Sequence, residues 1–303
     1  HRYLHSFPTR RSSDLDIVET NTFNANRVSQ EDYHMAHQVS ALNRTSAKIA
    51  LKAAAAATEK DGKQRFVFGA MGPTNRTLSI SPKVEDPSYR SIEFDDLLSA
   101  YQEQAEALIE GGVHGFIVET VFDALNARAA LIAIDNANAR HGVNLPVILS
   151  GTLTDRSGRT LTGQTLEAFF TSLESDSLLA VGLNCSFGAK ELVPYIKELA
   201  RTSKHYISIY PNAGLPNQFG AYDELPETTV HFLTELLEDQ SVNLVGGCCG
   251  TTPQHIEAIA NFVAQFPPRI PKPEVVQGLS EYALTLAGLE NLIVDTSRNY
   301  VNV

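Results

Sequence analysis

The chain has 303 residues, 43% of them hydrophobic and 19% charged, so it can bury a large core and is not disordered as a whole. Its 24 basic and 35 acidic residues give a formal net charge of −11. This charge disfavours nucleic-acid and anionic-membrane partners, because phosphate binding needs a basic surface. No apolar run approaches the roughly 18 residues that a membrane span needs.

Residues 1–15 (HRYLHSFPTRRSSDL) differ in composition from the rest of the chain. They hold three arginines and one aspartate, and they lack the apolar stretch of a secretory signal. We interpret them as a foreign leader that resembles translated adapter sequence, and we exclude them from the fold. The absence of a secretory signal and the low count of three cysteines predict a cytoplasmic protein with reduced thiols.

Short apolar runs, most of them rich in β-branched residues, predict seven β-strands. In chain order these runs are residues 17–18, 66–68, 116–118, 147–149, 180–183, 206–209 and 242–245. Segments with helical periodicity lie between them, and the clearest is Phe94 to Glu110, which ends at two glycines. The other predicted helices lie near residues 31–58, 123–140, 165–175, 188–202, 226–238 and 253–265.

The strict alternation of strands and helices predicts a parallel α/β fold. Its spacing is typical of a (β/α)8 TIM barrel, but only seven units are present, so the barrel lacks its first βα unit. A doubly wound sheet is the alternative, although the sequence holds neither G-x-G-x-x-G after a first strand nor a P-loop. Four prolines within residues 267–273 predict a stiff linker after a barrel of residues 16–266, and the tail is expected to lie outside the barrel.

All three cysteines follow the ends of predicted strands. Cys185 follows the run at 180–183, and Cys248 and Cys249 follow the run at 242–245. Because the carboxyl ends of barrel strands converge on one face, the three thiols are expected to meet there. Three thiolates suit zinc, and three protein ligands leave a fourth position open, as in catalytic zinc sites. An all-sulfur site is better suited to hold an added thiol as thiolate than to activate water.

Three other readings of the cysteines remain open at this stage. They are buried thiols without a function, a vicinal disulfide at Cys248–Cys249, or the pair of a thiol redox protein. The redox reading is disfavoured because the C-x-x-C spacing is absent. Thr252 and Pro253 then predict the cap and the first residue of a helix directly after the cysteine pair.

Several segments resemble those of zinc-dependent homocysteine S-methyltransferases. The string VGGCCGTTP at 245–253 and the string GLNC at 182–185 resemble the signatures of that family. The string DIVETNTF at 16–23 resembles the second strand of that family and its loop. Further segments most resemble the homocysteine-binding module of cobalamin-dependent methionine synthases: GAMGPTNRTLSISP (69–82), ETVFDALNA (119–127), SGTLTDRSGRTLTGQT (150–165) and YPNAGLPNQFG (210–220). The tail from residue 286 is similar to the lead-in of the next, folate-binding module, so residues 267–303 are predicted to be a linker and that lead-in.

The resemblance implies that Cys185, Cys248 and Cys249 hold zinc and that the sulfur of homocysteine takes the open position and attacks a methyl group. It implies that Glu119 receives the amino group of homocysteine and that Asn212 fills the open position in the absence of substrate. The alternatives are a carboxylate that caps a loop and an asparagine that forms a turn. Three further residues at strand ends are expected to contact the substrate or to support the residues that do: Glu19, Asn21 and Asp155.

The resemblance also implies a methyl donor, methylcobalamin on a separate module, since the chain has no D-x-H-x-x-G cobalamin signature. The expected partners are therefore homocysteine and the folate- and cobalamin-binding modules of the same parent protein. The alternatives are S-methylmethionine or betaine as donor, or an inactive zinc-binding fragment. One departure from the family is that no Gly-rich first-strand loop precedes Asp16. His255 is expected to face outward rather than toward the metal.

Overall fold

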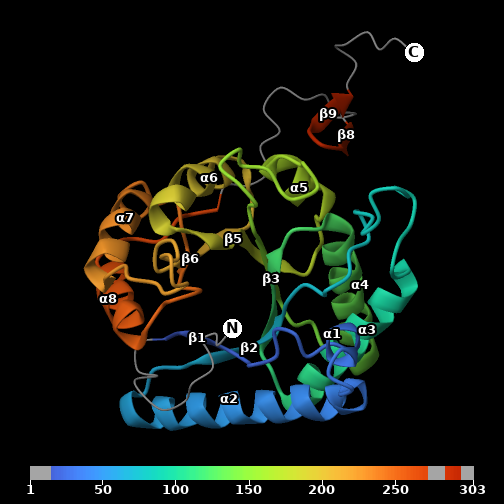
Figure 1. Cartoon of the computed structure of the whole chain (residues 1–303). Helices are drawn as coiled ribbons and strands as arrows, with labels where there is room; N and C mark the ends of the chain where they lie inside the picture. The colour runs from blue at the N-terminus through green and yellow to red at the C-terminus, as the bar shows by residue number, and fades with distance from the viewer. Residues whose placement is uncertain (1–14, 272–283, 295–303) are drawn as a thin grey trace.

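The computed structural model describes residues 15–271 and 284–294. Seven parallel strands pair in chain order, each with its neighbours along the sequence (Figure 1). They are β1 Ile17–Glu19, β2 Phe66–Met71, β3 Gly115–Val121, β4 Val147–Gly151, β5 Leu178–Gly188, β6 Tyr206–Asn212 and β7 Leu244–Val245. Because the strand order never reverses, the sheet is not doubly wound, and the barrel prediction is confirmed.

Helices follow the strands and cover the outside of the curled sheet (Figure 1). They are α1 Arg27–Glu31, the short 3-10 helix η3 Ala36–Gln38, α2 Val39–Asp61, α3 Phe94–Gly111, α4 Ala124–His141, α5 Leu166–Ser172, α6 Ala189–Thr202, α7 Pro226–Glu238 and α8 Pro253–Val263. Local chemistry sets their ends: Asp123 caps the amino end of α4, and Gly142 ends it in the left-handed conformation. Most predicted helices are thus present within a few residues of their predicted bounds. The segment predicted as one helix near 31–58 is instead divided, because α2 begins only at Val39 and α1 and η3 precede it.

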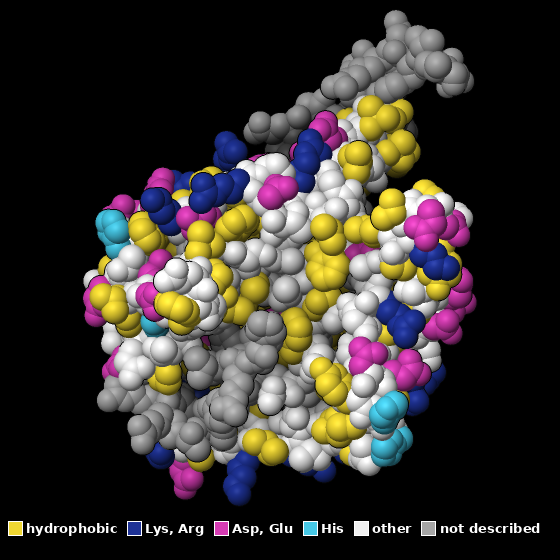
Figure 2. Space-filling model, viewed as in Figure 1, with side chains coloured by type: hydrophobic (Ala, Val, Ile, Leu, Met, Phe, Trp, Pro, Cys, Tyr) yellow, Lys and Arg dark blue, Asp and Glu magenta, His cyan; other side chains and the backbone are white. Residues whose placement is uncertain are grey.

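Side chains alternate along the strands between two apolar layers. Phe68, Ile117, Ile148 and Ala180 form one buried cluster inside the curl of the sheet. The intervening strand residues pack against the helices in a much larger core. Figure 2 shows charged side chains mainly around the periphery of the molecule, with hydrophobic and uncharged side chains nearer the centre. The strands are therefore buried on both faces, which explains their continuous apolar runs.

The sheet curls but does not close within the described residues. No strand pairing joins β7 to β1 there, and a cavity of about 310 Å³ lies between them. Its lining is mostly apolar and comes from both strands and from α8, for example from Ile17, Val245 and Ile259. The architecture is therefore a TIM-barrel-like fold with seven strands, as the count of βα units predicted.

The carboxyl-terminal part of the described chain forms a hairpin of β8 (Leu284–Ala287) and β9 (Asn291–Val294). This hairpin contacts the barrel, because the Thr165 amide donates to the Leu289 carbonyl (2.9 Å) and Asn291 donates to Thr171 (3.0 Å). The sequence predicted a linker and a tail outside the barrel and missed the hairpin. Residues 1–14 of the predicted leader lie outside the described residues. No helix in the described ranges is long and apolar enough to span a membrane.

Candidate metal centre

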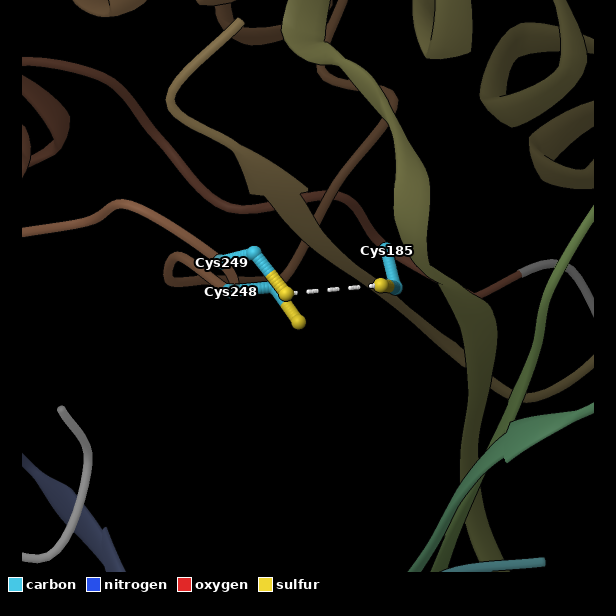
Figure 3. A group of neighbouring side chains, drawn as sticks. All are labelled: Cys185, Cys248 and Cys249. Carbon is cyan, nitrogen blue, oxygen red and sulfur yellow. Dashed lines mark hydrogen bonds between the residues drawn. The ribbon is translucent and has the colours of Figure 1, made fainter. Parts of the chain in front are cut away.

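The structure brings the three cysteines together at the carboxyl ends of the strands. Cys185 lies on β5, and Cys248 and Cys249 lie in the turn between β7 and α8. Their sulfur atoms all lie within 4.8 Å of one another, and the Sγ atoms of Cys185 and Cys249 are 3.7 Å apart. The side chains point toward one another from the two segments (Figure 3). The arrangement therefore gathers three soft donors that could hold one metal ion.

An irregular stretch of backbone directs Cys185 into the cluster. Cys185 and Ser186 have φ angles of 62° and 60°, in the left-handed region that residues with a side chain seldom occupy. The pairing of β5 with β6 shifts register between Asn184 and Gly188, as in a β-bulge that re-aims a side chain. The hydroxyl groups of Ser186 and Thr152 lie 2.9 Å apart and tie the bulge to the end of β4. Such strain persists only where the surrounding contacts hold it.

Asn184 is the centre of the hydrogen bonds beneath the cluster. Its side-chain oxygen accepts from the Ser150 hydroxyl (2.6 Å) and from the Thr120 amide (2.9 Å). Its side-chain nitrogen donates to the Thr120 hydroxyl (2.7 Å) and lies 3.9 Å from the sulfur of Cys248. Thr120 itself is left-handed, with a φ of 57°. One buried amide thus joins β3, β4 and β5 at the level of the sulfurs.

The turn that carries Cys248 and Cys249 is fastened to the end of β6. The Cys248 amide donates to the Pro211 carbonyl (2.7 Å), and the Cys249 amide donates to the side-chain oxygen of Asn212 (3.1 Å). The turn also needs glycine, because a Cβ at Gly246 would lie 2.4 Å from the ring of Tyr210. The adjacent cysteines are therefore held at fixed places beside the strand that follows Cys185.

The three thiols differ in acidity because they share hydrogen bonds. The hydrogen bonds that Cys249 shares with Cys185 and Cys248 lower its pKa to about 3. The hydrogen bonds of Cys248 with the other two thiols, together with its burial, hold its pKa well above the ordinary value. Cys249 is therefore the first of the three to ionise in the metal-free protein.

Helix α8 begins directly after the cysteines, as predicted. Thr252 caps it, and the side chain of His255 closes a capping box with the Thr252 amide (3.2 Å). The expectation that His255 faces outward is wrong: only 4% of its surface is exposed, and Nε2 donates to the Glu224 carbonyl (2.9 Å). Because both ring nitrogens are engaged in these bonds, His255 supports the turn rather than the metal.

Two predicted acidic residues, Glu119 and Glu19, interact electrostatically with each other. Glu119 on β3 is buried, and burial, with Glu19 and Cys185 nearby, raises its pKa well above the ordinary value. Glu19 on β1 also raises the pKa of the partly buried Tyr210, after the effect of desolvation. Glu19 therefore lies within electrostatic reach of Glu119, and Glu119 lies within electrostatic reach of Cys185.

The other predicted residues divide into one at the cluster and two at the surface. Asn212 is 2% exposed and contacts the cysteine turn. Asn21 is exposed after β1. Asp155 is exposed as well, and hydrogen bonds from the side chain of Ser157 and from its amide (2.7 Å) lower the pKa of the carboxyl group. Among the described interactions, none links Asn21 or Asp155 to the cysteines.

The sequence and the fold of the chain are both similar to those of known proteins. The sequence model of the homocysteine S-methyltransferase family matches residues 12–263. The structure is similar to the metallated form of the homocysteine methyltransferase MmuM from Escherichia coli, with a TM-score of 0.66 and 21% identity over 85% of this chain and 82% of that one. The oxidized form of the same protein matches with a TM-score of 0.66 and 20% identity, again over 85% and 82%. Because the sequence identity is this low, the structural similarity supports the assignment of the fold alone.

The fold and the cluster together define a TIM-barrel-like protein with three thiols at the carboxyl ends of its strands. The chain belongs to the homocysteine S-methyltransferase family, whose sequence model covers most of its length. Family membership assigns methyl transfer to homocysteine as its class of reaction.

Proposed function

We propose that the protein transfers a methyl group to the thiol of homocysteine, giving methionine, with zinc held by Cys185, Cys248 and Cys249. The observation that carries the proposal is the convergence of three sulfur donors within 4.8 Å. Three protein ligands leave a fourth position for an incoming thiol. The donor set fits zinc because thiolates are soft ligands that magnesium and calcium do not select. Zinc, when bound, supplies a positive charge that keeps an added thiol ionised at neutral pH.

The three thiols differ in protonation state before the metal binds. Cys249 is ionised at neutral pH even without metal, since its pKa is about 3. Cys248 keeps its proton until a cation binds, because its pKa is raised well above the ordinary value. Metal binding is therefore expected to release protons from the cluster.

We assign the amino group of homocysteine to Glu119, with Glu19 beside it. Because its pKa is raised, this buried carboxyl group keeps its proton at pH values near 4.5, where an ordinary glutamate ionises. It becomes an anion once an ammonium group lies against it. The substrate cation thus offsets the cost of burying the charge. With the amino end held on β3, the side chain of homocysteine can extend toward the sulfurs, and its thiolate attacks the methyl carbon while the donor departs with the bonding electrons.

The other sequence-based assignments stay part of the proposal. Asn212 fills the fourth position before substrate binds, which its contact with the Cys249 amide supports. Asn21 and Asp155 contact the substrate from the loops after β1 and β4. The methyl donor is methylcobalamin on a separate module, and the partners are the cobalamin- and folate-binding modules of a parent protein in the cytoplasm.

A donor assay tests the proposal. The full chain, loaded with zinc and supplied with homocysteine, receives methylcobalamin, S-methylmethionine or betaine in separate reactions, and methionine is quantified by mass spectrometry. We expect methionine from methylcobalamin and none from a Cys249→Ser control. Turnover with S-methylmethionine or betaine alone would overturn the choice of donor, and no methionine with any donor would contradict methyl transfer and favour a zinc-binding role.

A further inference from the structure

Tyr222 lies beside the cysteine cluster, on the loop of residues 213–225 between β6 and α7. A Cβ at Gly250 would lie 2.3 Å from both the Cβ and the Cγ atoms of Tyr222. Gly250 directly follows Cys249 and has a φ of 78°, a conformation that a side chain would also strain. The root of the tyrosine ring therefore rests on the backbone of the cysteine turn, at a place where only glycine leaves room for it.

The loop that carries Tyr222 is internally braced. The side-chain oxygen of Asn217 accepts from the amides of Phe219 (2.9 Å) and Ala221 (3.0 Å), and its side-chain nitrogen donates to Asp223 (2.7 Å). The Asn217 amide in turn donates to the Ala221 carbonyl (2.8 Å). These bonds close a compact turn immediately before Tyr222.

A second anchor lies on the other side of Tyr222. The buried ring of His255 donates to the Glu224 carbonyl (2.9 Å) while its other nitrogen contacts the Thr252 cap of α8. The Glu224 carboxylate also accepts from Thr229 in the first turn of α7 (2.6 Å). The loop is thus fastened to the helix that begins at the cysteines, so the position of the tyrosine is fixed relative to the cluster.

Tyr222 lies close enough to Cys249 for each of the two groups to shift the pKa of the other. We propose that Tyr222 is a positioning residue of the metal centre, whose hydroxyl donates to the Cys249 thiolate and fixes that sulfur within the three-sulfur set. This inference rests on the proposed function, in which the three sulfurs hold zinc. A donor to a metal-bound thiolate draws electron density from the sulfur and holds its orientation, and the loss of such a supporting group typically weakens metal binding about 10–100-fold.

Spectroscopy of the cobalt-substituted protein tests this role. Co²⁺ replaces zinc in the full chain, and the sulfur-to-cobalt charge-transfer bands of wild type and Tyr222→Phe are compared. Phenylalanine keeps the ring on Gly250 and removes only the hydroxyl group. Without the donated hydrogen bond the sulfur lone pair rises in energy, so the band is expected to move to lower energy, and the Kd for zinc in chelator competition is expected to rise about 10-fold.

Two further variants sharpen the test. Tyr206→Phe removes a hydroxyl group from the start of β6, at the opposite end of the strands, and is expected to leave the band and the Kd unchanged. Tyr222→3-fluorotyrosine makes the hydroxyl group a stronger donor, so the band is expected to move the opposite way, to higher energy. This variant retains the hydroxyl group and so tests the role even if Tyr222→Phe fails to fold.

The outcomes separate this inference from the proposed function. A band at the wild-type energy in both Tyr222 variants, with a Kd for zinc within about twofold of wild type, would overturn the role of Tyr222 alone. The absence of thiolate-to-cobalt bands in the wild-type protein would instead overturn the three-sulfur metal site itself, and the role of Tyr222 with it.

Discussion

Replacement of Asn184 by alanine removes the amide that joins three strands under the cluster. The change leaves the Thr120 amide and the Ser150 hydroxyl without their acceptor and the Thr120 hydroxyl without its donor. Each buried group left unsatisfied costs roughly 1–3 kcal/mol. The serine and threonine hydroxyls can rotate to other partners, so we expect a loss of about 2–4 kcal/mol in the free energy of unfolding. Because Asn184 adjoins Cys185, zinc affinity is expected to fall about 10–100-fold.

The assay pairs urea unfolding of the zinc-free protein with chelator competition for zinc. The matched control is Asn243→Ala, which removes an amide that accepts from the Ile207 amide (3.0 Å) and donates to the Arg269 carbonyl (2.7 Å), near the start of β7 and away from the thiols. We expect this control to lose a similar free energy of unfolding while it keeps its zinc affinity. Wild-type zinc affinity in Asn184→Ala, or equal losses of affinity in both variants, would refute the reasoning.

Three further predictions concern the packing, the acidic pair and the thiols. Gly182→Ala would place a Cβ 2.0 Å from the Ser208 carbonyl oxygen, so it is expected to lower the free energy of unfolding, measured in urea, by more than about 3 kcal/mol. The control Gly288→Ala, whose Cβ would lie 3.7 Å from the nearest atom, is expected to keep the wild-type free energy of unfolding. Equal stabilities of the two variants would contradict the close approach of the strands. Burial raises the pKa of Glu119 above the ordinary value of 4.5, so its contribution to stability is fully present below pH 4.5 and is lost as the pH rises through the raised pKa. The stability of Glu119→Gln relative to wild type should therefore increase as the pH rises above 4.5 in a series of urea titrations, and a difference independent of pH would count against the buried position. A chelator added to the zinc-loaded protein is expected to expose three reactive thiols to a colorimetric thiol reagent, and full reactivity before chelation would argue that the thiols are not metal-bound.

Sequence periodicity sufficed for most of the fold because the strands and helices are locally encoded. The run at 66–68 predicted β2, which extends to Met71, and the two glycines after Glu110 predicted the end of α3. The meeting of the cysteines also followed from the sequence, since parallel strands bring their carboxyl ends to one face. These inferences need only the order of the elements, which the chain itself specifies.

The contacts that refine the site depend on long-range register and could not be read from the chain. Asn184 lies within the quoted GLNC string, yet its role comes from Thr120 and Ser150 on neighbouring strands. Tyr222 lies on a loop that His255 fastens and whose path is set by tertiary contacts, so neither helical phase nor spacing indicated these two residues. The hairpin after the proline-rich segment was missed because prolines near residue 270 predict only that a helix does not continue there.

The most direct test of the central claim is X-ray absorption at the zinc edge, recorded on the zinc-loaded chain with and without homocysteine. The account predicts three sulfur scatterers at about 2.3 Å and one lighter ligand without substrate, and four sulfur scatterers with homocysteine bound. Fewer than three sulfur scatterers in the absence of substrate, or a sulfur count that homocysteine leaves unchanged, would contradict a three-thiolate zinc site that accepts the substrate thiol.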